Sequence, residues 1–169
     1  LAESGYTIPT RVVHAAPAVA DWIRSHVENP VLVGPDSESE QWVEAVARLA
    51  SAPHLVLEKI RRGDREVEVS VPNVEDFKDH TPVLVDDIIS TSRTMVETLR
   101  HLADADMAPA ICVGIHPVFS GDGLGVLEQA APALIVSCDT IPHPTNEIAL
   151  ASVLAVAVAE VLSEDRGAG

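Results

Sequence analysis

Aromatic and basic residues are scarce in this chain of 169 residues. Phe, Tyr and Trp make up 3% of it, and 11 Lys and Arg stand against 26 Asp and Glu, for a formal net charge of −15. Proteins that bind nucleic acid need cations for the phosphates and aromatic rings for the bases. The composition therefore argues against a nucleic-acid partner. An anionic substrate would bind only where a bound cation, a basic cluster or the N–H groups at a helix start offset the negative charge of the chain.

Cysteines and long apolar runs are also rare. Cys112 and Cys138 lie in separate apolar runs without a Cys-x-x-Cys motif, so we interpret them as buried thiols of a protein in a reducing compartment. The most apolar run, residues 148–159, is shorter than the roughly 20 residues that a membrane-spanning helix needs. The first residues, LAESGYTIPTR, lack the basic flank and apolar region of a secretory signal. We expect a cytoplasmic protein with no membrane partner.

The pattern of apolar residues indicates one α/β domain that covers residues 1–169. With 47% hydrophobic residues, the chain can bury the core of a single domain. Short, continuous apolar runs are typical of parallel strands covered on both faces, and here they alternate with segments of helical period. The runs are residues 31–33, 55–57, 83–85, 111–115 and 134–136. We therefore predict three layers: an open parallel sheet of about five strands, with helices on both of its faces.

Two segments depart from this pattern. Residues 66–71 alternate polar and apolar side chains, and together with residues 58–64 they predict a β-hairpin or flap. Residues 148–162 are apolar nearly all round, so this helix is expected to be either deeply buried or packed against another subunit. We accordingly expect a homo-oligomer, either a dimer or larger.

Polar residues gather where the predicted strands end, which is where open parallel sheets bind ligands. In the stretch VLVDDIISTSRTM, residues 83–95, the acids Asp86 and Asp87 follow an apolar strand, and a hydroxyl-rich turn then leads into a helix expected from Thr94. Hydroxyls, free N–H groups and the positive end of a helix dipole together form a phosphate cradle. The two carboxylates would suit sugar hydroxyls or a hydrated magnesium ion.

Simpler explanations stay open for this stretch and for two other strand ends. Ser90 or Ser92 could be no more than a helix cap that follows a solvated acid pair. The segment GPDSESE, residues 34–40, is explained by a Pro-Asp turn with a capping serine. The segment EKIRR, residues 58–62, is the densest positive charge in the chain, and it is either a solvated basic turn or part of a flap that closes over a polyphosphate.

Four segments, in order along the chain, resemble those of a known family. VLVDDIISTSRTM resembles the ribose-5-phosphate-binding signature shared by phosphoribosyltransferases and ribose-phosphate pyrophosphokinases. The other three segments, LVLEKIRRGDREVEV, VGPDSESEQWVEAVA and CDTIPHPTNEIALASVLA, resemble the flap, the magnesium-binding turn and the closing segment of the pyrophosphokinases. Together the matches extend from Thr10 to Leu162, so the resemblance covers almost the whole chain.

This resemblance implies a type I phosphoribosyltransferase fold and a Mg²⁺-dependent transfer of pyrophosphate from ATP, the co-substrate, to ribose 5-phosphate. The products would be phosphoribosyl pyrophosphate and AMP. The 5′-phosphate would bind to a loop of five residues: Ser90, Thr91, Ser92, Arg93 and Thr94. Asp86 and Asp87 would bind the ribose hydroxyls, and Asp36 would help to hold Mg²⁺. Lys59 and Arg61 would stabilise the pyrophosphoryl group during its transfer.

The chain also departs from the family it resembles. Arg93 stands where many relatives have glycine, no glycine lies between Asp86 and Met95, and Glu38 and Glu40 replace small residues. The resemblance covers only the second of two similar halves, so we interpret the chain as the C-terminal half of a longer two-domain protein that need not be catalytically complete alone. Two alternatives stay open: a phosphoribosyltransferase that uses phosphoribosyl pyrophosphate and a nitrogenous base, and a non-catalytic homologue that binds a sugar phosphate or regulates through it.

Overall fold

The structure is a computed structural model that describes residues 10–36, 39–62, 66–70 and 74–167, without the side chains of residues 58–62, 66–70 and 164–167. Its helices and strands are α2 Ala16–His26, β1 Pro30–Gly34, α3 Glu40–Ala50, β2 His54–Val56, β3 Glu58–Arg62, β4 Glu66–Ser70, a 3-10 turn Val74–Phe77, β5 Thr81–Ile89, α4 Arg93–Asp104, β6 Ile111–Pro117, α5 Gly123–Gln129, β7 Leu134–Cys138, β8 Asn146–Ile148 and α6 Ala151–Gly167.

Six parallel strands form the main sheet, in the order β2-β1-β5-β6-β7-β8. Five of them lie at the predicted apolar runs. The prediction of about five strands missed β8, because two of its three residues, Asn146 and Glu147, are polar and only Ile148 is buried. Such a short strand carries no apolar run of its own, and its pairing with β7 is what defines it.

Strand β5 is longer than predicted. It was expected to end at Val85, before the two acids, but it continues to Ile89. Ile88 pairs with His116, and Ile89 pairs with Pro117, so β6 extends the ladder beyond the acids. The acids therefore lie within the last part of a strand, which holds their backbone rigidly.

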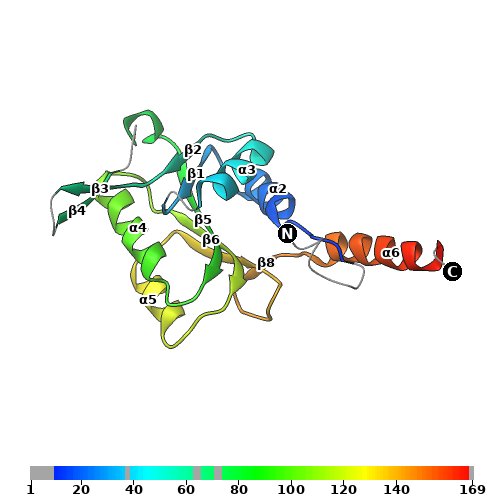
Figure 1. The fold of residues 1–169 in the computed structure, drawn as a ribbon. Coiled ribbons are helices and arrows are strands. Elements are labelled where there is room, and N and C mark those ends of the chain that lie inside the picture. The colour runs from blue at the N-terminus through cyan, green and yellow to red at the C-terminus, as the bar shows by residue number, and fades with distance from the viewer. Residues whose placement is uncertain (1–9, 37–38, 63–65, 71–73, 168–169) are drawn as a thin grey trace.

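Helices cover the sheet on both faces, with α2 and α3 on one face and α4 and α5 on the other (Figure 1). In β5, Val83 and Val85 pack into the core on the α2–α3 face, whereas Leu84 between them packs into the core on the α4–α5 face. Successive side chains of a strand point to opposite faces, so a continuous apolar run fills both cores at once. The predicted three-layer α/β fold is confirmed.

Strands β3 and β4 form the predicted hairpin. They pair antiparallel, with Lys59 opposite Val69 and Arg61 opposite Val67, and they extend beyond the main sheet (Figure 1). The two cysteines are also as predicted. Cys112 and Cys138 are buried and unpaired, and burial raises the pKa of each thiol to about 12.

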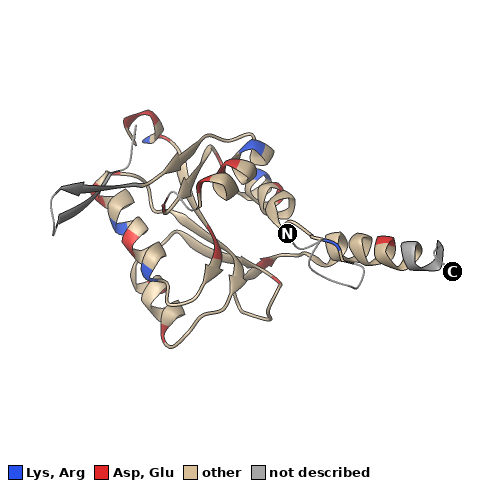
Figure 2. Ribbon diagram, in the orientation of Figure 1, with Lys and Arg blue, Asp and Glu red and all other residues tan. Residues whose placement is uncertain are grey.

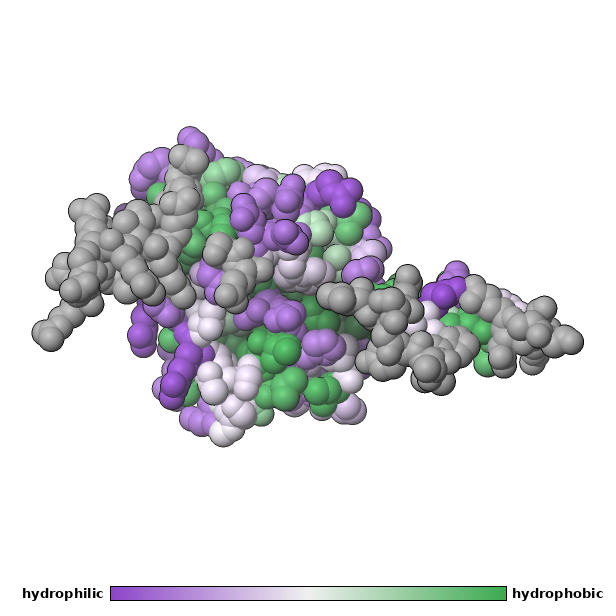
Figure 3. Space-filling view, in the orientation of Figure 1, coloured by the Kyte–Doolittle hydropathy of each residue, from purple (hydrophilic) through white to green (hydrophobic). Residues whose placement is uncertain are grey.

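Helix α6 extends away from the rest of the chain (Figure 1), and Figure 3 shows apolar side chains on its surface. The exposed fractions are 48% for Leu154, 61% for Val156, 56% for Val158 and 57% for Leu162. Of the two predicted environments, deep burial is therefore wrong for this chain, and packing against another subunit stays a prediction. Within the described residues, none of the helices has the length and apolar character needed to cross a membrane.

Candidate functional site

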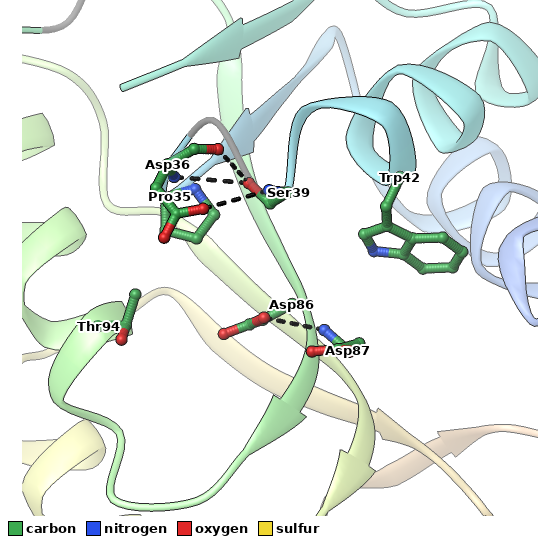
Figure 4. A pocket seen from close by; sticks show the side chains of 7 residues that line it. All are labelled: Pro35, Asp36, Ser39, Trp42, Asp86, Asp87 and Thr94. Atoms are coloured by element: carbon green, nitrogen blue, oxygen red, sulfur yellow. Dashed lines mark hydrogen bonds between the residues drawn. The ribbon is translucent and has the colours of Figure 1, made fainter. Parts of the chain in front are cut away.

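The candidate site is a cavity of about 380 Å³ at the carboxyl ends of β1 and β5, shown in Figure 4. Open parallel sheets bind ligands at this edge. Seven residues, from the turn after β1, from β5 and from the starts of α3 and α4, line the cavity: Pro35, Asp36, Ser39, Trp42, Asp86, Asp87 and Thr94. The structure thus brings together Asp36, Asp86, Asp87 and Thr94, which the sequence predicted for one site although they are up to 58 positions apart.

A tight turn after β1 carries Asp36 into the cavity wall. The backbone N–H of Ser39 donates to Asp36 Oδ1 at 3.2 Å, and the Ser39 hydroxyl donates to the Asp36 carbonyl at 2.7 Å. A Cβ atom on Gly34 would lie 2.7 Å from Ser39 Oγ, so a larger residue at this position would displace the hydroxyl that bonds to the turn. The predicted Pro-Asp turn is therefore present. Ser39 precedes α3, but its hydroxyl bonds back to the turn and makes no cap hydrogen bond with the helix.

Two like charges meet at the end of β5. Burial is the main cause that raises the pKa of Asp86 from 3.8 to about 6, followed by repulsion from the Asp87 carboxylate, with a smaller contribution from Asp36. The backbone N–H of Asp87 donates to Asp86 Oδ1 at 3.0 Å and partly offsets this shift. Three carboxylates thus line one cavity and repel one another, so a bound cation or the hydroxyl groups of a ligand would stabilise their charged forms.

The hydroxyl-rich loop lies beside this cavity and lines a second one of about 120 Å³. Ser92 adopts a left-handed conformation, with φ 62°, immediately before α4, which begins at Arg93, one residue earlier than predicted. Ser92 is 5% exposed, and its hydroxyl has no hydrogen-bond partner among the residues that the structure describes. Ser92 therefore occupies the cap position but does not cap the helix, so the simple capping interpretation fails for Ser92.

Ser92 also explains how the loop can form without glycine. A left-handed residue is normally glycine, and here a serine takes that conformation. Arg93 follows as the first residue of α4, a helix whose ribbon carries blue segments for basic residues in Figure 2. Among the described residues, Arg93 belongs to none of the ion pairs. The loop thus combines an unused buried hydroxyl, a helix start and an available cation.

The two cavities share Asp86 and Thr94, so one ligand can occupy both. The smaller cavity has nine lining residues: Asp86, Ile88, Ile89, Ser90, Thr91, Ser92, Arg93, Thr94 and Met95. Its hydroxyls, helix start and guanidinium suit an anion. The larger cavity, with its carboxylates, suits neutral hydroxyl groups or a cation. All five predicted loop residues, Ser90 to Thr94, therefore border a cavity.

The predicted flap residues are only partly described. Lys59 and Arg61 are in β3, but their side chains lie outside the described residues, as does Glu38. The backbone N–H of Leu57, just before the flap, donates to the carbonyl of Gly34 at 3.0 Å. The hairpin thus starts at the edge of the sheet that also carries Asp36, and a contact between its basic side chains and a ligand stays a prediction.

Two residues near the site were not predicted to belong to it. Trp42 was interpreted as part of the core face of its helix, yet its side chain also lines the larger cavity. The sequence did contain a signal for Trp42, because a helix that starts directly after a strand-end turn places the residues of its first turn beside the site. Ser120 was also missed. Its hydroxyl lies 3.1 Å from that of Ser90, and no local sequence pattern links positions 30 residues apart.

Comparison with known proteins gives concordant results. The family described as phosphoribosyl transferase domain matches residues 10–153. A curated ribose-phosphate pyrophosphokinase from Methanopyrus kandleri is 30% identical over 155 residues, which are 90% of this chain and 53% of that protein. The chain therefore spans about half the length of this relative, in agreement with the predicted resemblance to one half of the pyrophosphokinases.

Solved structures show the same fold. A phosphoribosylpyrophosphate synthetase from Mycobacterium smegmatis has a TM-score of 0.74 at 23% identity, over 89% of this chain and 51% of that one. An adenine phosphoribosyltransferase from Trypanosoma brucei, solved with AMP, pyrophosphate and ribose 5-phosphate, has a TM-score of 0.53 at 15% identity, over 80% of this chain and 69% of that one. The predicted phosphoribosyltransferase-like fold is therefore confirmed.

Proposed function

The chain belongs to the phosphoribosyl transferase domain family, and from that premise we propose that it supplies the ribose 5-phosphate site of a ribose-phosphate diphosphokinase. The observation that carries this proposal is the pair of adjoining cavities that share Asp86 and Thr94. One suits a phosphate and the other suits a ring with several hydroxyls. A phosphorylated sugar has these two parts side by side.

The chain's own residues would bind and orient the sugar phosphate. N–H groups at the start of α4, the hydroxyls of the loop and the Arg93 guanidinium would hold the 5′-phosphate. Asp86 and Asp87 would accept hydrogen bonds from the ribose hydroxyls. Lys59 and Arg61 of the flap would neutralise charge on the transferred group, since phosphoryl transfer depends mainly on positioning and on electrostatic stabilisation.

The donors at the site fit Mg²⁺. Across the described parts of the chain, no group of three or more His, Cys, Asp or Glu side chains is arranged to hold a metal by itself. Mg²⁺ is usually bound through one or two carboxylates, with waters and substrate oxygens as the other ligands. Asp36, which lines the cavity with Asp86, is the proposed ligand. When bound, Mg²⁺ would neutralise phosphate charge beside these acids.

In the proposed reaction, the 1-hydroxyl oxygen of ribose 5-phosphate bonds to the β-phosphorus of ATP. The bond between that phosphorus and the oxygen that bridges it to the α-phosphorus breaks, and AMP leaves with this oxygen. The hydroxyl proton passes to solvent. The product is phosphoribosyl pyrophosphate. The chain would hold the sugar phosphate in place for this attack, and orientation of this kind is a large part of catalysis.

A phosphoribosyltransferase is the second candidate, because the adenine phosphoribosyltransferase fold also matches. A non-catalytic sugar-phosphate-binding homologue is the third, since the chain spans about half of its curated relative. All three share the sugar-phosphate site. A diphosphokinase forms AMP from ATP and ribose 5-phosphate, a phosphoribosyltransferase releases pyrophosphate from phosphoribosyl pyrophosphate when a base is added, and a binding homologue does neither.

Isothermal titration of the chain with ribose 5-phosphate tests the shared site. We expect binding that is lost in Asp86→Asn plus Asp87→Asn. The matched control is Asp104→Asn plus Asp106→Asn, which removes the same charge at exposed positions at and just beyond the other end of α4. Unchanged binding in the first double variant would show that the acid pair does not form the site. AMP formation in the protein of natural length, lost in Lys59→Ala with sugar-phosphate binding kept, separates the diphosphokinase from the other candidates.

A further inference from the structure

Trp42 has a position that packing alone does not explain. Its indole is partly buried and packs against the core on the α2–α3 face, and it also lines the larger cavity. In Figure 4 it lies across the cavity from Thr94, with the pyrrole edge of the indole turned toward Asp87. Its Nε1 is buried and has no hydrogen-bond partner among the described residues. Buried donors are rarely left unpaired, because the loss of their hydrogen bonds to water is costly.

The other walls of the cavity restrict what can approach the indole. Asp36, Asp86 and Asp87 would repel an anionic group, so the phosphate of a ligand belongs in the neighbouring loop cavity. The part of the ligand that binds in the larger cavity is therefore expected to be a neutral group whose hydroxyls donate to the carboxylates. A pentose ring is such a group. It also offers a C–H face that can pack on an indole, and oxygen atoms that can accept from Nε1–H.

We propose that Trp42 is a specificity-determining residue that contacts the pentose ring of the bound sugar phosphate, by packing and by donation from Nε1. This inference rests on the proposed function, and it deepens that function by dividing the recognition between two elements. The start of α4 and its loop bind the phosphate, while α3 recognises the sugar through Trp42. Because the indole is anchored in the core, little side-chain entropy is lost when it makes this contact.

Tryptophan fluorescence gives a direct test. The chain has two tryptophans, and Trp22 is 8% exposed and stacks on His26, with ring centroids 4.7 Å apart. In Trp22→Phe, Trp42 is the only tryptophan, and selective excitation of tryptophan separates its emission from that of Tyr6. We expect ribose 5-phosphate, added with Mg²⁺, to change its emission with the same Kd that calorimetry gives. Inorganic phosphate, which reaches only the loop, is expected to leave the emission nearly unchanged.

Two variants separate the packing contact from the hydrogen bond. Trp42→Phe keeps an aromatic ring in the core but removes Nε1–H, and we expect ribose 5-phosphate affinity to fall roughly 3- to 10-fold, the range for one lost hydrogen bond. Trp42→Ala also removes the ring and is expected to weaken binding further. Affinity for inorganic phosphate is expected to stay within about twofold in both, which a general loss of structure would not permit. Trp22→Phe is the matched control, since it alters a tryptophan of the same core.

The outcomes distinguish this inference from the proposed function. If both Trp42 variants bind ribose 5-phosphate as tightly as the parent, while Asp86→Asn plus Asp87→Asn abolishes binding, the inference is overturned and the proposed site stands. If affinity for inorganic phosphate falls as much as affinity for the sugar phosphate, the role of Trp42 is structural and the inference is again overturned. If the parent chain binds no ribose 5-phosphate, both proposals fall.

Discussion

The hydroxyls of Ser90 and Ser120 lie 3.1 Å apart, and the backbone N–H of Ser120 donates to the Ser90 carbonyl at 3.2 Å. These contacts join the proposed phosphate loop after β5, residues 90–94, to the loop after β6. Gly123, at the start of α5, also approaches Ser90 so closely that a Cβ atom there would collide with the Ser90 carbonyl oxygen. The shape of the proposed phosphate site therefore depends on a neighbouring segment that does not line it.

Gly123→Ala is expected to displace the phosphate loop and to weaken ribose 5-phosphate binding about tenfold, the scale of one lost charge-assisted hydrogen bond. Calorimetric titration measures this loss. Gly121→Ala is the control: Gly121 has φ 59° with nothing within 4 Å of a Cβ atom, so the change is expected to cost stability and leave affinity unchanged. Equal affinities in the parent and Gly123→Ala would show that the contact does not position the loop.

Ser92→Gly is expected to stabilise the fold and to impair binding. Glycine relieves the left-handed strain of about 1 kcal/mol and removes an unpaired buried hydroxyl, so the free energy of unfolding should rise. The same hydroxyl is proposed to bind the phosphate, so affinity should fall several-fold. Ser51→Gly is the control, because Ser51 is exposed with φ 57° at the end of α3. It should stabilise the chain without any effect on binding, and urea unfolding and calorimetry together check both variants.

The stability of the chain is expected to depend on the ionisation of Asp86. Its pKa is raised from 3.8 to about 6 on folding, so the folded state binds the proton more tightly than the unfolded state does. The free energy of unfolding should therefore fall as the pH rises from 3.8 to about 6. Urea unfolding across this interval should show a flatter profile for Asp86→Asn, which should also be more stable than the parent at pH 7. Asp104→Asn is the matched control, and a profile unchanged by Asp86→Asn would contradict the assignment.

Magnesium is expected to raise the melting temperature at neutral pH, because binding to the folded state alone stabilises it by mass action. The three carboxylates of the cavity should make this effect specific to the site. Differential scanning fluorimetry with Mg²⁺, and then with excess EDTA, measures it. Asp36→Asn should abolish the increase, whereas Asp79→Asn, at an exposed position outside the cavity, should keep it. An increase that survives Asp36→Asn would rule out Asp36 as the ligand.

Helix α6 is expected to mediate self-association. Leu154 and Val158, one turn apart and 48% and 56% exposed, also border an apolar groove with Val13. Leu154→Asp plus Val158→Asp should convert an oligomer into a monomer with little change in the free energy of unfolding of the domain body. Sedimentation velocity measures the mass. The control is Val126→Asp, a 38% exposed valine on α5, which should leave the mass unchanged.

The sequence by itself determined the layered fold and predicted most of the residues that line the candidate site. Continuous apolar runs such as residues 83–85 fill two cores at once, so they indicate parallel strands covered on both faces without any structural information. The carboxyl ends of parallel strands meet at one edge, and this rule brought Asp36 and Asp86 to the same predicted site. These inferences needed only local patterns and one general rule of topology.

The tertiary structure alone decided what depends on contacts between distant segments. β8 exists because it pairs with β7, the unused hydroxyl of Ser92 follows from a left-handed backbone, and Ser120 supports Ser90 across two strands. Trp42 is the clearest case. Its helical spacing predicts a core residue, and the indole does pack against the core, but the same indole also forms a wall of the cavity. Periodicity records which face of a helix is apolar, whereas packing in three dimensions decides whether that face meets the core, a ligand or both.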